Sequence, residues 1–187
     1  MGVKKVNAVL GLILTLACIS HIAVQLYAAL SHQELGAAAK LPVHICMGAA
    51  ALHILLSFGM IFFIHEGKSL KTYPKANAGV ILQRCSGILM VVLLVFHFRL
   101  SKIVLSAGES GMGLFVLCMC VMILFFGTVF LHISVSFTKA LVTLGIITER
   151  STKRKIDHIL WVVMGIAFLA VSILMTYAYI GLYHTGG

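Results

Sequence analysis

Five long apolar stretches constrain the fold more than any other feature of the sequence. A helix needs about 20 mostly apolar residues to cross the hydrocarbon core of a bilayer, and five segments meet this requirement. We expect membrane-spanning helices over about 6–30, 41–64, 76–98, 112–137 and 159–183. The whole chain, residues 1–187, is therefore predicted to form a single transmembrane domain of the all-α class.

Composition agrees with this prediction. Hydrophobic residues make up 61% of the chain, charged residues 10%, and the mean hydropathy is +1.10, values far from those of a water-soluble domain. The connections between the apolar stretches are short and leave no room for an aqueous domain. A reaction on a water-soluble substrate would have to take place on another polypeptide, so we expect a subunit of a larger complex.

Lysine and arginine are concentrated in alternate connections, which predicts the orientation, because cytoplasmic loops carry the excess of these residues. The N-terminus, loop 65–75 and loop 138–158 contain Lys4, Lys5, Lys68, Lys71, Lys75, Lys139, Arg150, Lys153, Arg154 and Lys155. The opposite loops contain only Lys40, Arg99 and Lys102. We expect a cytoplasmic N-terminus and an outer C-terminus. The net charge of +9 is then explained by this orientation and does not indicate nucleic acid as a partner. Alternatively, the basic cytoplasmic loops could bind an acidic partner or anionic lipid.

The smaller polar and reactive residues carry less information. All five acidic residues lie in predicted loops or at helix borders, whereas ion and proton carriers usually place a carboxylate in the membrane core. The five cysteines fall inside the predicted helices without a CxxC pair, so we expect them to pack as small apolar residues. The acidic residues are Glu34, Glu66, Glu109, Glu149 and Asp157. The cysteines are Cys18, Cys46, Cys85, Cys118 and Cys120.

Four of the nine histidines lie well inside successive apolar stretches: His21, His53, His97 and His132. With a rise of about 1.5 Å per residue, His21 lies roughly 22 Å and His97 roughly 30 Å above the cytoplasmic boundary. The helices of His53 and His132 run in the opposite direction and place them roughly 18 Å and 30 Å below the outer boundary. The four residues therefore sort into an outer pair and an inner pair.

In an up-down-up-down bundle, each of these pairs lies on diagonal helices. Two haems, each held by an imidazole on either side of the iron, would use this arrangement. A bare metal such as zinc fits less well, because ligands separated by half the membrane cannot close one tetrahedral site. The remaining alternative is that each histidine only forms a hydrogen bond between helices. The other histidines lie in loops or near the interfaces, and His44 is the main rival to His53.

Two segments carry a resemblance to a known family: "ILQRCSGILMVVLLVFHF" and "FLHISVSFTKALVTLGIITER". They resemble the cytochrome b membrane anchor of succinate dehydrogenase and fumarate reductase (complex II), in its single-subunit, di-haem form. The strings "ISHIAVQ", "ALHILLSFGMIFF", "VFHF" and "FLHISVSF" match its four axial histidines. The resemblance covers most of residues 8–157, and its most specific parts are Gln83-Arg84, Ser86-Gly87 and Leu144-Gly145-Ile146.

The resemblance implies a four-helix haem-binding bundle plus one additional helix in a bacterial cytoplasmic membrane. His21 and His97 would hold the distal haem b, and His53 and His132 the proximal one. The partners would be an iron–sulfur subunit and a flavoprotein on the cytoplasmic side. A quinone would be the electron carrier, and in the di-haem members of the family this is usually menaquinone. The chain would be the electron-transfer subunit and would carry no catalytic residue for the dicarboxylate chemistry.

Arg84 lies about two turns into its helix, where its side chain could bind a haem propionate or a quinone oxygen. Its head group could instead reach out to the interface. The family's quinone-site carboxylate has no counterpart in a helix here, and Glu34 and Glu109 are unaligned outer-side candidates. Two other functions compete: a cytochrome b anchor of a hydrogenase or formate dehydrogenase, and a haem-free transport or assembly protein.

Overall fold

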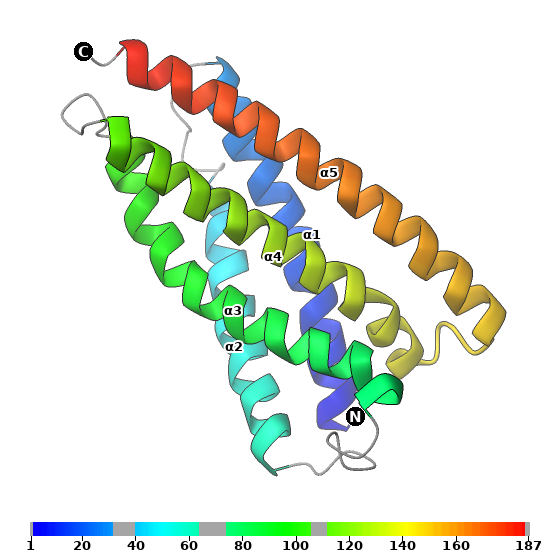
Figure 1. The fold of residues 1–187 in the computed structure, drawn as a ribbon. Coiled ribbons are helices and arrows are strands. Elements are labelled where there is room, and N and C mark those ends of the chain that lie inside the picture. The colour runs from blue at the N-terminus through cyan, green and yellow to red at the C-terminus, as the bar shows by residue number, and fades with distance from the viewer. Residues whose placement is uncertain (1, 32–39, 64–73, 106–111, 186–187) are drawn as a thin grey trace.

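The computed structural model describes residues 2–31, 40–63, 74–105 and 112–185, and within these ranges the regular structure is helical throughout. The helices are α1 (Val3–Ser31), α2 (Leu41–Phe63), α3 (Pro74–Leu105), α4 (Met112–Leu144) and α5 (Arg150–Thr185) (Figure 1). All five are long and apolar enough to cross a membrane. The predicted all-α membrane fold with five transmembrane helices is confirmed.

The helices extend beyond the apolar stretches that predicted them. Most of the expected loop 138–158 is helical, since α4 continues to Leu144 and α5 begins at Arg150. Asp157 therefore lies within α5, where it accepts hydrogen bonds from Thr138 of α4 and from Lys153. At the other end of the bundle, Arg99 and Lys102 lie in α3 and not in a loop. Charged residues account for these differences: Lys139, Arg99 and the basic run at 150–155 interrupt or flank the apolar stretches, although the helices continue through them.

The short connection between α4 and α5 begins at Gly145, which has a φ of +81°. The amide of Gly145 donates to Val142 O at 3.0 Å, and the amide of Ile146 donates to Leu141 O at 2.9 Å. These two bonds form a Schellman motif, which satisfies the last carbonyls of a helix and favours glycine at this position. The Leu144-Gly145-Ile146 segment is thus a helix stop that turns the chain towards α5.

The central helix is α4. Half of its most apolar window is buried (50%), against 11% or less for each of the other helices. Its buried residues Phe125, Phe126 and Phe130 form the core with Leu93 of α3 and Met175 of α5. α4 packs against α1, α3 and α5. α2 packs closely against α1, but within the described residues it has no comparable contact with α3 or α4.

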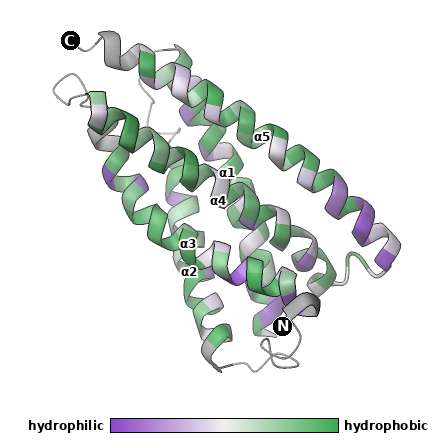
Figure 2. Ribbon diagram, viewed as in Figure 1, coloured by the Kyte–Doolittle hydropathy of each residue, from purple (hydrophilic) through white to green (hydrophobic). Residues whose placement is uncertain are grey.

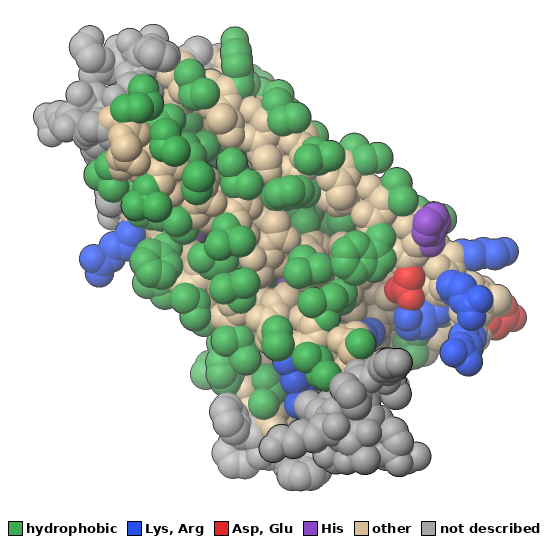
Figure 3. Space-filling model, viewed as in Figure 1, with side chains coloured by type: hydrophobic (Ala, Val, Ile, Leu, Met, Phe, Trp, Pro, Cys, Tyr) green, Lys and Arg blue, Asp and Glu red, His purple; other side chains and the backbone are tan. Residues whose placement is uncertain are grey.

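The helices are hydrophobic along most of their length (Figure 2), and the face of the molecule seen in Figure 3 is largely apolar. Large side chains such as Leu16, Leu55 and Tyr177 point outward and are exposed, which is the arrangement expected for a surface that faces lipid. Polar residues gather where α5 begins, at the end of the bundle where the N-terminus also lies. The protein is therefore a multi-pass membrane protein with one strongly basic end.

Candidate functional site

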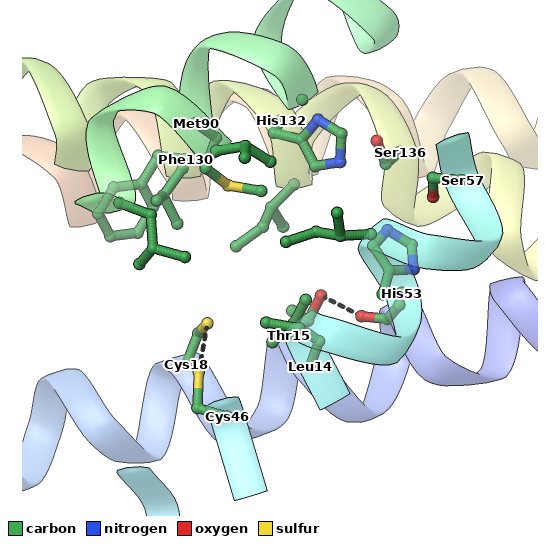
Figure 4. A pocket seen from close by; sticks show the side chains of 18 of the residues that line it. Leu14, Thr15, Cys18, Cys46, His53, Ser57, Met90, Phe130, His132 and Ser136 are labelled. Atoms are coloured by element: carbon green, nitrogen blue, oxygen red, sulfur yellow. Dashed lines mark hydrogen bonds between the residues drawn. The ribbon is translucent and has the colours of Figure 1, made fainter. Parts of the chain in front are cut away.

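A cavity of about 680 Å³ lies inside the bundle. It lies between α2 on one side and α3 and α4 on the other, which are not in close contact with α2. Residues of all five helices line the cavity. This volume is within the range of pockets that bind cofactors. The four histidines singled out in the sequence all line it: His21, His53, His97 and His132. The two inner ones are visible in Figure 4, where His53 from α2 and His132 from α4 project towards the same space.

The outer pair is brought together directly. The ring centres of His21 on α1 and His97 on α3 lie 6.4 Å apart, with the ring planes at 89°. A metal ion bound between two imidazoles at metal–nitrogen distances of about 2.0–2.1 Å would separate the ring centres by about 6.3 Å. Phe125 of α4 stacks on His97 with a centroid distance of 4.8 Å and limits its rotation. The outer pair therefore has the spacing that two axial ligands require.

Each histidine of the inner pair lies against a glycine of a neighbouring helix. A Cβ atom built on Gly11 of α1 would lie 3.4 Å from Cε1 of His53, and one built on Gly87 of α3 would lie 3.2 Å from Cε1 of His132. The second distance is tighter than ordinary van der Waals contact. The absence of a side chain at Gly87 therefore allows the His132 ring to approach α3.

The two glycines also define the spacing between the pairs. Gly11 precedes His21 by ten residues on α1, and Gly87 precedes His97 by ten residues on α3. Ten residues of helix correspond to about 15 Å, so the inner and outer histidines occupy two levels of the same cavity. We did not predict the contacts of Gly11 and Gly87; the repeated ten-residue spacing is the signal that would have indicated them.

The ring nitrogens differ in their partners. Nδ1 of His132 lies 3.0 Å from Oγ of Ser86 on α3, and Ser86 is buried (3% exposed). Nδ1 of His21, His53 and His97 is buried without a hydrogen-bond partner among the described residues. Histidines that serve only to bridge helices would form such bonds. A side-chain hydrogen bond that orients the ring, as is usual behind a metal-binding histidine, is thus present for His132, and His53 has a backbone partner in Asn7 of α1.

The end of the cavity towards the N-terminus is positively charged. Lys4, Arg84 and Lys139 line it, and no described acidic residue does. Lys139 of α4 donates to Gly79 O at 2.6 Å and to Gln83 Oε1 at 3.0 Å, which joins α4 to α3. Arg84 is half-buried and has no carboxylate partner in the described part of the chain. Carboxylate groups of a ligand fit this end of the cavity, because Arg and Lys bind them by charge-assisted hydrogen bonds.

The remaining candidates do not contribute to the cavity or cannot be placed. His44 and His158 are exposed, and neither lines the cavity. His44, the rival to His53, therefore points away from the site. His32, His65, Glu34 and Glu109 lie outside the described residues, and the side chain of His184 is not described either.

The histidines do not form a site for a bare metal ion with three or more protein ligands; within the described residues, the histidines, cysteines and carboxylates form no such group. Comparison of the chain with protein-family models, curated proteins and solved structures gives no match.

Proposed function

We propose that this chain is the di-haem cytochrome b membrane anchor of a succinate:quinone oxidoreductase. The observation that carries the proposal is the facing pair His21 and His97, whose ring centres lie 6.4 Å apart, above a second pair that lines the same 680 Å³ cavity. The resemblance of the QRCSG segment, residues 83–87, and of the Leu144-Gly145-Ile146 segment to complex II anchors favours this complex over a hydrogenase or formate dehydrogenase.

In this proposal His21 and His97 are the axial ligands of a distal haem b, and His53 and His132 those of a proximal one. When bound, the two haems would supply one-electron transfer between the iron–sulfur subunit and a quinone. The chain would hold the rings in place, exclude water with its apolar helices and set the reduction potentials through burial and hydrogen bonds. Arg84 and Lys139, at the basic end of the cavity, would bind propionates of the proximal haem; for Arg84, a quinone oxygen is the alternative.

The partners follow from the same proposal. An iron–sulfur subunit and a flavoprotein subunit dock on the basic, cytoplasmic side and carry out the succinate and fumarate chemistry of the tricarboxylic acid cycle and the respiratory chain. The chain is then the electron-transfer subunit of the enzyme, in a bacterial cytoplasmic membrane, with its N-terminus inside and its C-terminus outside. Menaquinone is the proposed quinone.

The test is a dithionite-reduced minus oxidised absorption spectrum of the purified chain, with pyridine haemochrome quantification of haem per polypeptide. We expect two b-type haems per chain. Protein without haem, purified from its native source, would refute the proposal and favour a haem-free transport or assembly protein. Against that alternative, the buried Nδ1 atoms of His21 and His97 have no hydrogen-bond partner among the described residues. A co-purifying subunit with covalent flavin would distinguish complex II from a hydrogenase or formate dehydrogenase anchor.

A further inference from the structure

Two cysteines on neighbouring helices are in contact. Sγ of Cys18 on α1 and Sγ of Cys46 on α2 lie 3.2 Å apart, and both residues line the cavity. Figure 4 shows the two side chains end to end at the cavity wall. We expected all five cysteines to pack as small apolar residues. Cys118 does so, with 1% exposure, and Cys85 and Cys120 are exposed, but Cys18 and Cys46 form a pair.

The pair lies close to the level of the outer histidines. On α1, Cys18 is three residues before His21 and seven after Gly11, which corresponds to about 4.5 Å and 10.5 Å along the helix. On α2, Cys46 lies in the second turn from the helix start at Leu41. Cys18 therefore lies at the middle of α1 and Cys46 near the start of α2, which is the end away from the basic end of the bundle, and both residues line the cavity.

We propose that Cys18 and Cys46 form a redox-active pair, a reversible intramembrane disulfide that joins α1 to α2. A disulfide has an S–S distance of about 2.05 Å, so each sulfur atom has to move by less than about 1 Å from the observed contact. Because α1 and α2 already pack against each other, rotation of the two side chains can supply this movement.

A lipid-soluble quinone is the proposed oxidant, and this part of the inference rests on the proposed function. Both S–H bonds break and one S–S bond forms. Two electrons and two protons pass to the carbonyl oxygens of the quinone, which becomes a hydroquinone. Quinone-linked oxidation of protein dithiols operates on the outer side of bacterial membranes. In the reverse direction a dithiol reductant restores both thiols.

The disulfide would change the site without changing its ligands. The helices it joins carry His21 and His53, one histidine of each pair. A covalent link at 18–46 would hold these two helices together along the cavity wall. The ratio of quinone to hydroquinone in the membrane would then determine whether α1 and α2, which carry half of the histidine ligands, are covalently linked.

The experiment uses the full chain in its native membrane, as wild type and as the variants Cys18→Ser, Cys46→Ser and Cys120→Ser. Cys120→Ser is the matched control because Cys120 is exposed and lies on α4. Membranes are treated with diamide, a general dithiol oxidant, or with duroquinone, whose fully methylated ring cannot add a thiol. Free thiols are then blocked with N-ethylmaleimide, and peptides are analysed by mass spectrometry without reduction.

We expect wild type and Cys120→Ser to lose two free thiols per chain with either oxidant and to yield a linked peptide pair containing Cys18 and Cys46. Dithiothreitol should restore both thiols. In Cys18→Ser and Cys46→Ser, the remaining partner should stay free. Absence of the link in wild type after diamide, or links to other cysteines instead, would overturn the proposal. A link formed with diamide and not with duroquinone would overturn the quinone as oxidant.

Haem is quantified in the same membranes, so the two proposals can fail separately. A linked pair in protein without haem would leave the disulfide in place and remove the cytochrome function. Two haems per chain without a linked pair would do the opposite.

Discussion

Ser86 Oγ lies 3.0 Å from His132 Nδ1, so a buried residue of α3 fixes the ring of a histidine on α4. Ser86 Oγ also lies 3.1 Å from the carbonyl oxygen of Gln83, to which it donates. With its hydrogen used in this way, the serine oxygen can accept the Nδ1 proton of His132. The Nε2 atom of the ring is then the nitrogen available to a ligand in the cavity.

Ser86→Ala tests this relationship. Loss of a partner behind a metal-binding histidine typically lowers metal affinity by about 10–100-fold, so we expect weaker retention of the proximal haem and normal retention of the distal one. Haem stoichiometry during detergent dilution and a potentiometric titration of both haems measure the effect. The matched control is Ser134→Ala, since Ser134 is buried on α4 and, among the described residues, bonds to Phe130 O of its own helix and to no histidine. Equal loss in both variants would contradict a specific role for Ser86.

Replacement of the histidines should separate the two proposed haems. We expect His21→Ala and His97→Ala to remove the same haem, because these rings face each other at 6.4 Å. His53→Ala and His132→Ala should remove the other one. Pyridine haemochrome quantification should give one haem per chain in each variant, and two potentiometric components should become one.

The control for this series is His44→Ala, which should retain both haems because His44 is exposed. Loss of the inner haem in His44→Ala, with both haems retained in His53→Ala, would mean that the ligand on α2 is wrongly assigned. Loss of both haems in all four cavity variants would indicate one shared site and contradict the separation of the histidines into an outer and an inner haem site.

Gly87→Ala should disturb the inner pair by steric contact. The added Cβ would lie 3.2 Å from Cε1 of His132, so the ring has to shift, while alanine in place of glycine stabilises a helix interior by about 0.5–1 kcal/mol. We expect a stably folded protein whose proximal haem has an altered absorption band and reduction potential. Gly48→Ala on α2 is the control, since a Cβ there has nothing within 4 Å. Identical spectra for the two variants would show that the Gly87 contact does not constrain His132.

The fold could be predicted from the sequence more fully than the contacts within it. Length and apolar content predict five membrane-spanning helices, and a constant rise per residue orders the histidines by depth. The rotation of each helix about its axis is harder to predict, because helices that face lipid or one another are apolar on every side. For this reason neither the Cys18–Cys46 contact nor the approach of His132 to Gly87 could be predicted, although both depend on which faces meet. The start of α5 was missed because its first turns are polar and have no hydropathy signal, and the end of α4 was missed because Lys139 interrupts its apolar run and was assigned to a loop.

Removal of positive charge from the basic end of the cavity should lower one reduction potential. Arg84 and Lys139 line that end, and no described acidic residue lines the cavity. Reduction of a haem adds a negative charge, which a nearby cation stabilises, and the effect is strong in a poorly hydrated interior. In Arg84→Gln and Lys139→Gln we therefore expect a lower potential for the proximal haem and a much smaller change for the distal one. Arg99→Gln is the charge-matched control, because Arg99 is exposed near the opposite end of α3 and does not line the cavity. A potentiometric titration of each variant measures both potentials, and an unchanged or raised proximal potential in both cavity variants would mean that these cations do not face the haem.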